Sequence, residues 1–156
     1  MSAGGAAQPD EQLLRAFGDE VMRMTGRRTT SYAGSVLENS AFRILWLLEE
    51  SGPRTLRELS EELQLEQSTI NRQVNAALRH GYVERFAAAG RSGRLVRPTP
   101  EGRRAYLHDA HRRAALYARA LDELGPDRAL AMVESFRAFN DALDRAHETE
   151  APPDGR

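Results

Sequence analysis

The chain has 156 residues, 40% of them apolar, a length that suits one domain with appended helices. Its formal net charge is −1, and all 22 basic residues are arginine. The absence of cysteine excludes disulfides, thiol catalysis and cysteine-ligated metal sites, and the absence of an apolar run of about 18 residues excludes a membrane-spanning helix.

The N-terminal third predicts two helices. Residues 1–9 are small and polar and are expected to be disordered. From Asp10 apolar residues recur at the spacing of one helix face, and Gly26 is expected to end that helix. The second helix, residues 39–51, is apolar on almost every face, which predicts a central position. Trp46 within it is expected in the core, with the lining of a ligand pocket as the alternative.

Two shorter helices joined by three residues follow. Thr55 and Glu58 have the spacing of a capping box, which predicts the start of the first helix. Residues 67–80 form the second, with apolar residues at i, i+4, i+7 and i+8, and Gly81 follows its end. Its opposite face contains no acid. At 100° per residue this face holds Ser68, Arg72, Asn75 and Arg79, with Thr69 beside them.

The periodicity then changes to that of a β-hairpin, with strands over residues 82–86 and 94–97. Arg91 and Arg94 lie at its Gly- and Ala-rich tip. Helix, turn, helix and hairpin in this order predict a winged helix-turn-helix, whose second helix enters the major groove of DNA. Arg, Asn, Ser and Thr suit base edges and phosphates, and an arginine-tipped hairpin suits the DNA backbone or minor groove. The alternatives are an ordinary polar helix and a hairpin whose arginines serve only solubility.

Two long helices complete the chain, from Thr99-Pro100 to about residue 124 and from Pro126 to about His147, with residues 150–156 expected to be disordered. The terminal helices carry more apolar surface than a winged domain of about 60 residues could cover, which predicts a dimer interface. A monomer with these helices folded back onto the core is the alternative. The residues predicted for the interface are Leu13, Phe17, Val21, Leu121, Val133, Phe136, Phe139 and Leu143.

The charge distribution supports a polyanion partner. Residues 54–121 contain 13 arginines and 7 acids, whereas residues 122–156 contain 4 arginines and 9 acids. A basic middle segment favours a local polyanion site, unless codon bias toward arginine has produced it by accident. His108 and His111 could share a metal, but no third ligand is identifiable, and no catalytic motif is present. We therefore expect neither a cofactor nor an enzyme.

Residues 41–102 resemble the MarR family of winged helix-turn-helix transcription regulators, most specifically in the segments QSTINRQV and TPEG. The resemblance implies a homodimer that binds double-stranded operator DNA and a small aromatic or anionic effector. It implies recognition-helix contacts by Ser68, Thr69, Arg72 and Gln73, and a wing contact by Arg91. The family often carries an Asp two residues before that arginine. Here the position is Ala89, so we expect Arg91 to lack support and Arg94 to share or take its role.

Together these observations predict a mainly α protein with a winged helix-turn-helix DNA-binding domain at residues 37–104. An N-terminal dimerisation helix and connection at 10–36 and C-terminal dimerisation helices at 105–149 flank it. The predicted function is a sequence-specific regulator in the cytoplasm, a ligand-responsive repressor on a pseudo-palindromic operator. The alternative is a winged-helix protein-interaction module without operator binding. The predicted DNA contacts are Thr55, Ser68, Thr69, Arg72, Gln73, Asn75, Arg79, Arg91 and Arg94.

Overall fold

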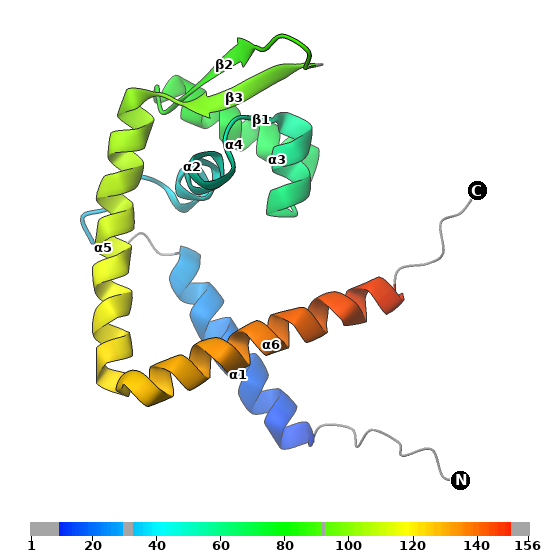
Figure 1. Cartoon of the computed structure of the whole chain (residues 1–156), viewed down its shortest axis with the longest axis vertical. Helices are drawn as coiled ribbons and strands as arrows, with labels where there is room; N and C mark the ends of the chain where they lie inside the picture. The colour runs from blue at the N-terminus through cyan, green and yellow to red at the C-terminus, as the bar shows by residue number, and fades with distance from the viewer. Residues whose placement is uncertain (1–9, 30–32, 92, 151–156) are drawn as a thin grey trace. The chain divides into compact units, whose positions relative to one another are not determined.

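The computed structural model describes residues 10–29, 33–91 and 93–150, so the ends expected to be disordered lie almost wholly outside the described residues. The chain divides into two compact units between Ala110 and His111. The expectation of a mainly α winged helix-turn-helix is confirmed (Figure 1). The elements are α1 (Glu11–Thr29), α2 (Asn39–Ser51), β1 (Arg54–Thr55), α3 (Leu56–Leu63), α4 (Gln67–Arg79), β2 (Val83–Ala87), β3 (Arg94–Pro98), α5 (Pro100–Leu124) and α6 (Pro126–Glu150).

Helix α1 is longer than the sequence predicts. It continues through Gly26 to Thr29, so the expected end at Gly26 is wrong. A glycine inside a helix costs only about 1 kcal/mol relative to alanine, and Gly26 does not adopt the positive φ that ends many helices. At the other end of the chain, α6 extends to Glu150, beyond the expected His147.

The core of the first unit lies among α2, α3 and α4 and includes side chains of β2, β3 and α5. Helix α2 buries Ile44, Leu45, Leu47 and Leu48, which confirms its predicted central position. Trp46, however, is 47% exposed, so its expected place in the core is wrong. At 100° per residue its side chain points opposite to Ile44 and Leu48, which face the core.

The wing is the hairpin formed by β2 and β3. It belongs to a three-stranded antiparallel sheet in the order β1-β3-β2. In the hairpin, Arg85 on β2 pairs with Val96 on β3. Strand β1 was not predicted. It consists of two residues, Arg54 and Thr55, which pair with Val96 and Leu95, and two residues are too few to show an alternating pattern.

Two contacts attach the first half of α5 to the rest of the unit. Thr99 caps the helix, because its hydroxyl accepts from the Gly102 N–H at 3.0 Å and donates to the Gly81 carbonyl at 2.6 Å. Further along the helix, the fully buried Asp109 carboxylate accepts from the backbone N–H groups of Val36 and Leu37 at 3.0 and 2.9 Å. Since the carboxylate satisfies two donors, Asp109 fixes the chain just before α2.

Residues 111–150 form the second unit, made of the end of α5 and α6. Every described side chain of α6 is exposed except Ala129, which is half-buried. The predicted interface residues here include Phe136 at 47% exposure and Leu143 at 41%, while Leu121 on α5 is half-buried. An amphipathic helix with an uncovered apolar stripe normally buries that stripe against a partner.

Candidate nucleic-acid interface

Helix α4 presents a polar face that carries no acid. Ile70, Val74 and Ala77 are buried, and these three residues fix how the helix is rotated on the core. The predicted contacts then divide by exposure: Ser68, Arg72 and Arg79 are exposed, and Thr69, Gln73 and Asn75 are half-buried at the edges of that face. The surface therefore offers arginines, amides and hydroxyls, all of which can contact base edges or phosphates.

A side chain from the wing reaches this helix. The Arg85 Nη2 donates to Asn75 Oδ1 at 3.0 Å, and Asn75 Nδ2 donates to Asn71 Oδ1 at 3.3 Å. Neither Arg85 nor Asn71 was predicted as a site residue. The spacing of Asn71 and Asn75, four residues apart on one helix, was a signal that the sequence offered. Nothing in the sequence placed Arg85 beside them.

The other edge of the interface is the N-terminus of α3, where the predicted capping box is present. Thr55 Oγ1 accepts from the Glu58 N–H at 3.2 Å, and Glu58 Oε2 accepts from the Thr55 N–H at 2.7 Å. The Thr55 hydroxyl also donates to Glu58 Oε2 at 3.0 Å. The predicted contact Thr55 is therefore already engaged in capping α3.

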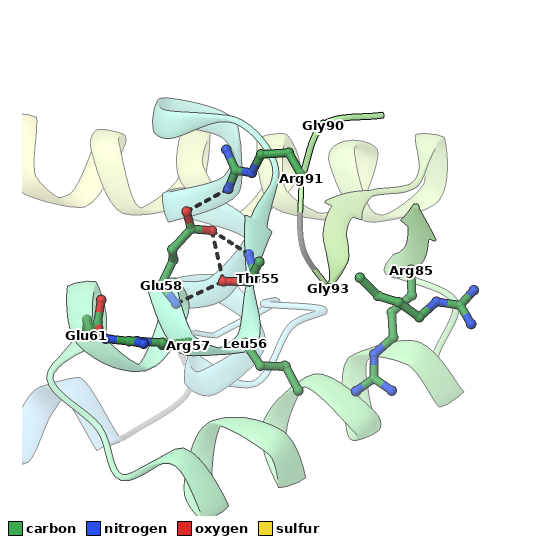
Figure 2. Close-up of a pocket in the computed structure, with 10 residues that line it drawn as sticks. Thr55, Leu56, Arg57, Glu58, Glu61, Arg85, Gly90, Arg91 and Gly93 are labelled. Carbon is green, nitrogen blue, oxygen red and sulfur yellow. Dashed lines mark hydrogen bonds and ion pairs between the residues drawn. The ribbon is translucent and has the colours of Figure 1, made fainter. Parts of the chain in front are cut away.

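The same carboxylate holds the wing arginine. Arg91 Nη2 lies 2.6 Å from Glu58 Oε1, as Figure 2 shows, so the expectation that Arg91 lacks support is wrong. The support comes from α3, 33 positions earlier in the chain, in place of the neighbouring wing residue Ala89. The pKa of Glu58 is lowered, first by the backbone hydrogen bond from Thr55 and also by the charges of Arg91 and Arg54. The carboxylate therefore stays charged at neutral pH and holds Arg91 in place.

The wing and α3 enclose an open hollow of about 780 Å³. Four arginines and two glutamates line it, and Arg57 pairs with Glu61 across its α3 side at 2.8 Å. Its positive excess suits a phosphate chain passing between the wing and α3. The lining residues are Thr55, Leu56, Arg57, Glu58, Glu61, Arg85, Gly90, Arg91, Gly93 and Arg94 (Figure 2).

One of the two histidines on α5 has a backbone partner. His108 Nε2 donates to the Gly34 carbonyl at 3.2 Å, and the residues that the structure describes contain no group of three potential metal ligands. Within the described ranges, no helix is both long and apolar enough to cross a membrane.

The fold and this surface define a winged helix-turn-helix protein. Residues 37–105, the segment that contains the winged helix, match the model of the MarR family. No curated protein sequence matches the chain.

Solved structures with the same fold cover most of the chain. A MarR family protein from Bacillus stearothermophilus is 22% identical, with a TM-score of 0.67 over 86% of this chain and 92% of that one. A mutant E. coli MarR, solved with operator DNA, is 18% identical, with a TM-score of 0.68 over 81% and 93%. Streptococcus pneumoniae FabT, solved with DNA, is 15% identical, with a TM-score of 0.67 over 86% and 95%. At these sequence identities the similarity shows a shared fold.

Proposed function

We propose that this MarR-family protein is a sequence-specific, double-stranded DNA-binding transcriptional regulator that represses by occupying its operator as a homodimer. One observation carries the proposal: the acid-free exposed face of α4 lies in one domain with an arginine-tipped wing. A recognition helix supplies base contacts and a wing supplies backbone contacts. The DNA complexes of FabT and the E. coli MarR mutant support it, because they show this fold on DNA.

The predicted DNA contacts form two groups in this proposal. Ser68, Thr69, Arg72, Gln73, Asn75 and Arg79 would face the major groove, with Arg72 suited to guanine O6 and N7. Thr55, Arg91 and Arg94 would lie along the phosphate backbone, where charge contributes affinity without base preference.

A second copy of the chain is the proposed partner of the exposed apolar residues on α1 and on α6. Leu13 and Phe17 on α1 and Val133, Phe136, Phe139 and Leu143 on α6 are each at least 40% exposed, while Val21 and Leu121 are half-buried. A two-fold dimer of winged domains would bind half-sites about 34 Å apart, which corresponds to a pseudo-palindromic operator. Residues 10–36 and 105–149 would form the dimerisation parts, and residues 37–104 the DNA-binding domain.

Regulation by a small aromatic or anionic effector is part of the proposal and rests on the family resemblance. The chain has no cysteine, so its own oxidation through a thiol is not an option. A ligand, a partner or the protein's abundance must therefore carry the signal.

The test is a titration of the purified full chain against the duplex that lies upstream of its own gene, with an unrelated duplex of equal length as control. We expect tighter binding to the upstream duplex, and the logarithm of its affinity should fall linearly with the logarithm of the salt concentration. Arg72→Ala should lower affinity by about 1–3 kcal/mol and relax base preference. Binding that is absent, or equal on both duplexes and insensitive to salt, would refute operator binding and favour the protein-interaction alternative.

A further inference from the structure

A chain of three side chains links the wing to the recognition helix. Arg85 leaves β2 and donates through Nη2 to Asn75 Oδ1 at 3.0 Å, and Asn75 donates through Nδ2 to Asn71 Oδ1 at 3.3 Å. Arg85 and Asn75 are half-buried, whereas Asn71 is exposed at the solvent end of the chain. The linked groups therefore run from the sheet to the surface of α4.

The orientation of both amides follows from the arginine. A guanidinium has donors and no acceptor, so only the oxygen of Asn75 can face Arg85. The Asn75 nitrogen must then point to Asn71, and only the oxygen of Asn71 can accept from it. This leaves the Asn71 Nδ2 group directed away from Asn75, and it donates to no described residue.

Asn71 lies where a recognition helix reads bases. It occupies the fifth position of α4, next to Arg72, and the N-terminal half of such a helix contacts base edges. An unconstrained asparagine can turn either its oxygen or its nitrogen to a base and so tolerates several bases. An asparagine whose oxygen is held by Asn75 instead keeps its nitrogen directed outward, so it presents donors to a base.

We propose that Asn71 is a specificity-determining residue that donates to a hydrogen-bond acceptor on one base edge, and that Asn75 and Arg85 are positioning residues that fix its orientation. The inference rests on the proposed DNA-binding function and names a determinant of its specificity. The suitable acceptors in the major groove are purine N7, guanine O6 and thymine O4. Cytosine offers only an N4 donor there, so Asn71 rejects it.

The rival interpretation is that Arg85 is simply one more positive charge near the DNA backbone, together with the other arginines of the hollow. Base preference distinguishes the two. A phosphate contact adds affinity equally for every sequence, whereas the loss of a positioning residue relaxes preference at one base pair.

The experiment is selection from a randomised duplex pool with the wild-type full chain, followed by affinity measurements on single-base variants of the selected site. Asn71→Asp is the main variant, because its Oδ1 still accepts from Asn75 while Oδ2 now presents an acceptor to the base. We expect the preferred base at one position to change from a base that offers an acceptor to cytosine, whose major-groove edge offers only the N4 donor, with discrimination altered about tenfold. Gln67→Glu is the matched control, since it adds the same charge to an exposed position of α4 outside the chain of hydrogen bonds.

Asn75→Asp and Arg85→Ala test the positioning role. Asn75→Asp removes the N–H group that donates to Asn71, and loss of Arg85 frees the Asn75 amide to turn. Both variants should relax preference at the same base pair that Asn71→Asp changes, with helical circular dichroism unchanged. The control Gln67→Glu should lower affinity and leave that base pair unaltered.

The outcomes separate this inference from the function on which it rests. If the wild-type chain enriches no sequence from the pool, the proposed function itself fails. If the wild type selects a site but Asn71→Asp keeps every base preference, Asn71 is not a specificity residue. If Asn71→Asp changes one base pair while Arg85→Ala lowers affinity uniformly, Arg85 is a phosphate contact and the positioning role is refuted.

Discussion

Gly102 shows how a single residue fixes the start of α5. A Cβ atom built at this position would lie 1.8 Å from the Tyr82 carbonyl oxygen, a backbone atom that cannot turn aside. The close approach lets Thr99 bond to Gly81 and to the Gly102 N–H at once. The glycine is therefore required by contact distance, and its backbone does not adopt a positive φ.

Gly102→Ala should destabilise the fold by about 3 kcal/mol, because inserting a methyl group into a filled space forces the backbone to shift. Urea unfolding followed by circular dichroism measures the free energy of unfolding. Gly18→Ala is the control, since nothing lies within 4 Å of its Cβ, and it should stabilise α1 by up to about 1 kcal/mol. Equal stability of the Gly102→Ala variant and the wild type would contradict the close contact.

Glu58 gives the stability of the domain a defined dependence on pH. Its pKa is lowered in the folded chain, mainly by the hydrogen bond from the Thr55 N–H. A carboxyl with a depressed folded pKa contributes stability that is complete above its unfolded pKa, about 4.3, and is lost as the pH falls through the folded pKa. Protonation removes both the charge and the ion pair with Arg91.

The stability difference between the wild type and Glu58→Gln should therefore be largest at neutral pH and shrink as the pH falls below about 4.3. Unfolding by urea at a series of pH values gives this difference. Gln67→Ala, which changes an exposed side chain without a titratable group, serves as the control with a flat difference. A Glu58→Gln difference that does not depend on pH would argue against the depressed pKa.

At the scale of single residues, local partners could be predicted and distant ones could not. The capping box joins Thr55 and Glu58 at a fixed spacing of three, and the structure contains it. The second partner of Glu58 is Arg91, which a strand pairing brings close from 33 positions away. Because the sequence shows no mark of that pairing, Arg91 was wrongly expected to lack support.

In the proposed function, α4 and the wing have different roles. The arginines of the wing tip lie near α3, and Glu58 fixes one of them without consuming every donor of its guanidinium. Arg91 can therefore be held by α3 and still contact a phosphate. Glu58, in the first turn of α3, therefore helps to position the wing arginine Arg91.

A double-mutant cycle over Glu58→Gln and Arg91→Ala tests that coupling in DNA binding. Arg91→Ala should weaken binding on all duplexes and reduce the salt slope by about 1. Glu58→Gln should weaken binding in the wild-type background and change it little once Arg91 is gone, because its effect acts through that arginine. Additive effects of the two substitutions would show that the ion pair does not prepare Arg91 for DNA.

Elements whose apolar residues repeat over several turns were predicted well from the sequence. Elements that form only through contact with a distant part of the chain were not. The buried stripe of α4, Ile70 to Ala77, was correct because a helix of 13 residues repeats its pattern over several turns. Strand β1 exists only because β3 lies beside it. The apolar residues of α2 predicted the helix correctly. Because they lie on almost every face of the helix, they did not indicate which face is exposed, and the prediction that Trp46 lies in the core was wrong.

For the whole molecule, the net charge of −1 conceals a separation of charge along the chain. Residues 67–98, which form α4 and the wing, contain six arginines and one acid, whereas α6 carries six acids and three arginines. Acids on α6 repel a polyanion, so DNA is favoured only at the domain that carries the recognition helix. The same helix has a long apolar stripe, which suits an interface between protein chains.

The last prediction concerns that stripe. Phe136, Phe139 and Leu143 recur at spacings of three and four, which places them on one face of α6, and each is at least 40% exposed. Phe136→Asp should convert the proposed dimer to a monomer at micromolar concentration, because a charge cannot be buried in an apolar interface without a partner. Sedimentation velocity measures the oligomeric state, and DNA titration measures the accompanying loss of affinity for a two-half-site duplex.

Ala138→Asp is the matched control, since it adds the same charge to an exposed position on the opposite side of α6. It should leave both the dimer and operator affinity intact. A monomeric wild type would refute the dimer outright. A Phe136→Asp variant that stays dimeric would move the interface away from this face, and operator affinity that survives dimer loss would mean that one winged domain suffices for recognition.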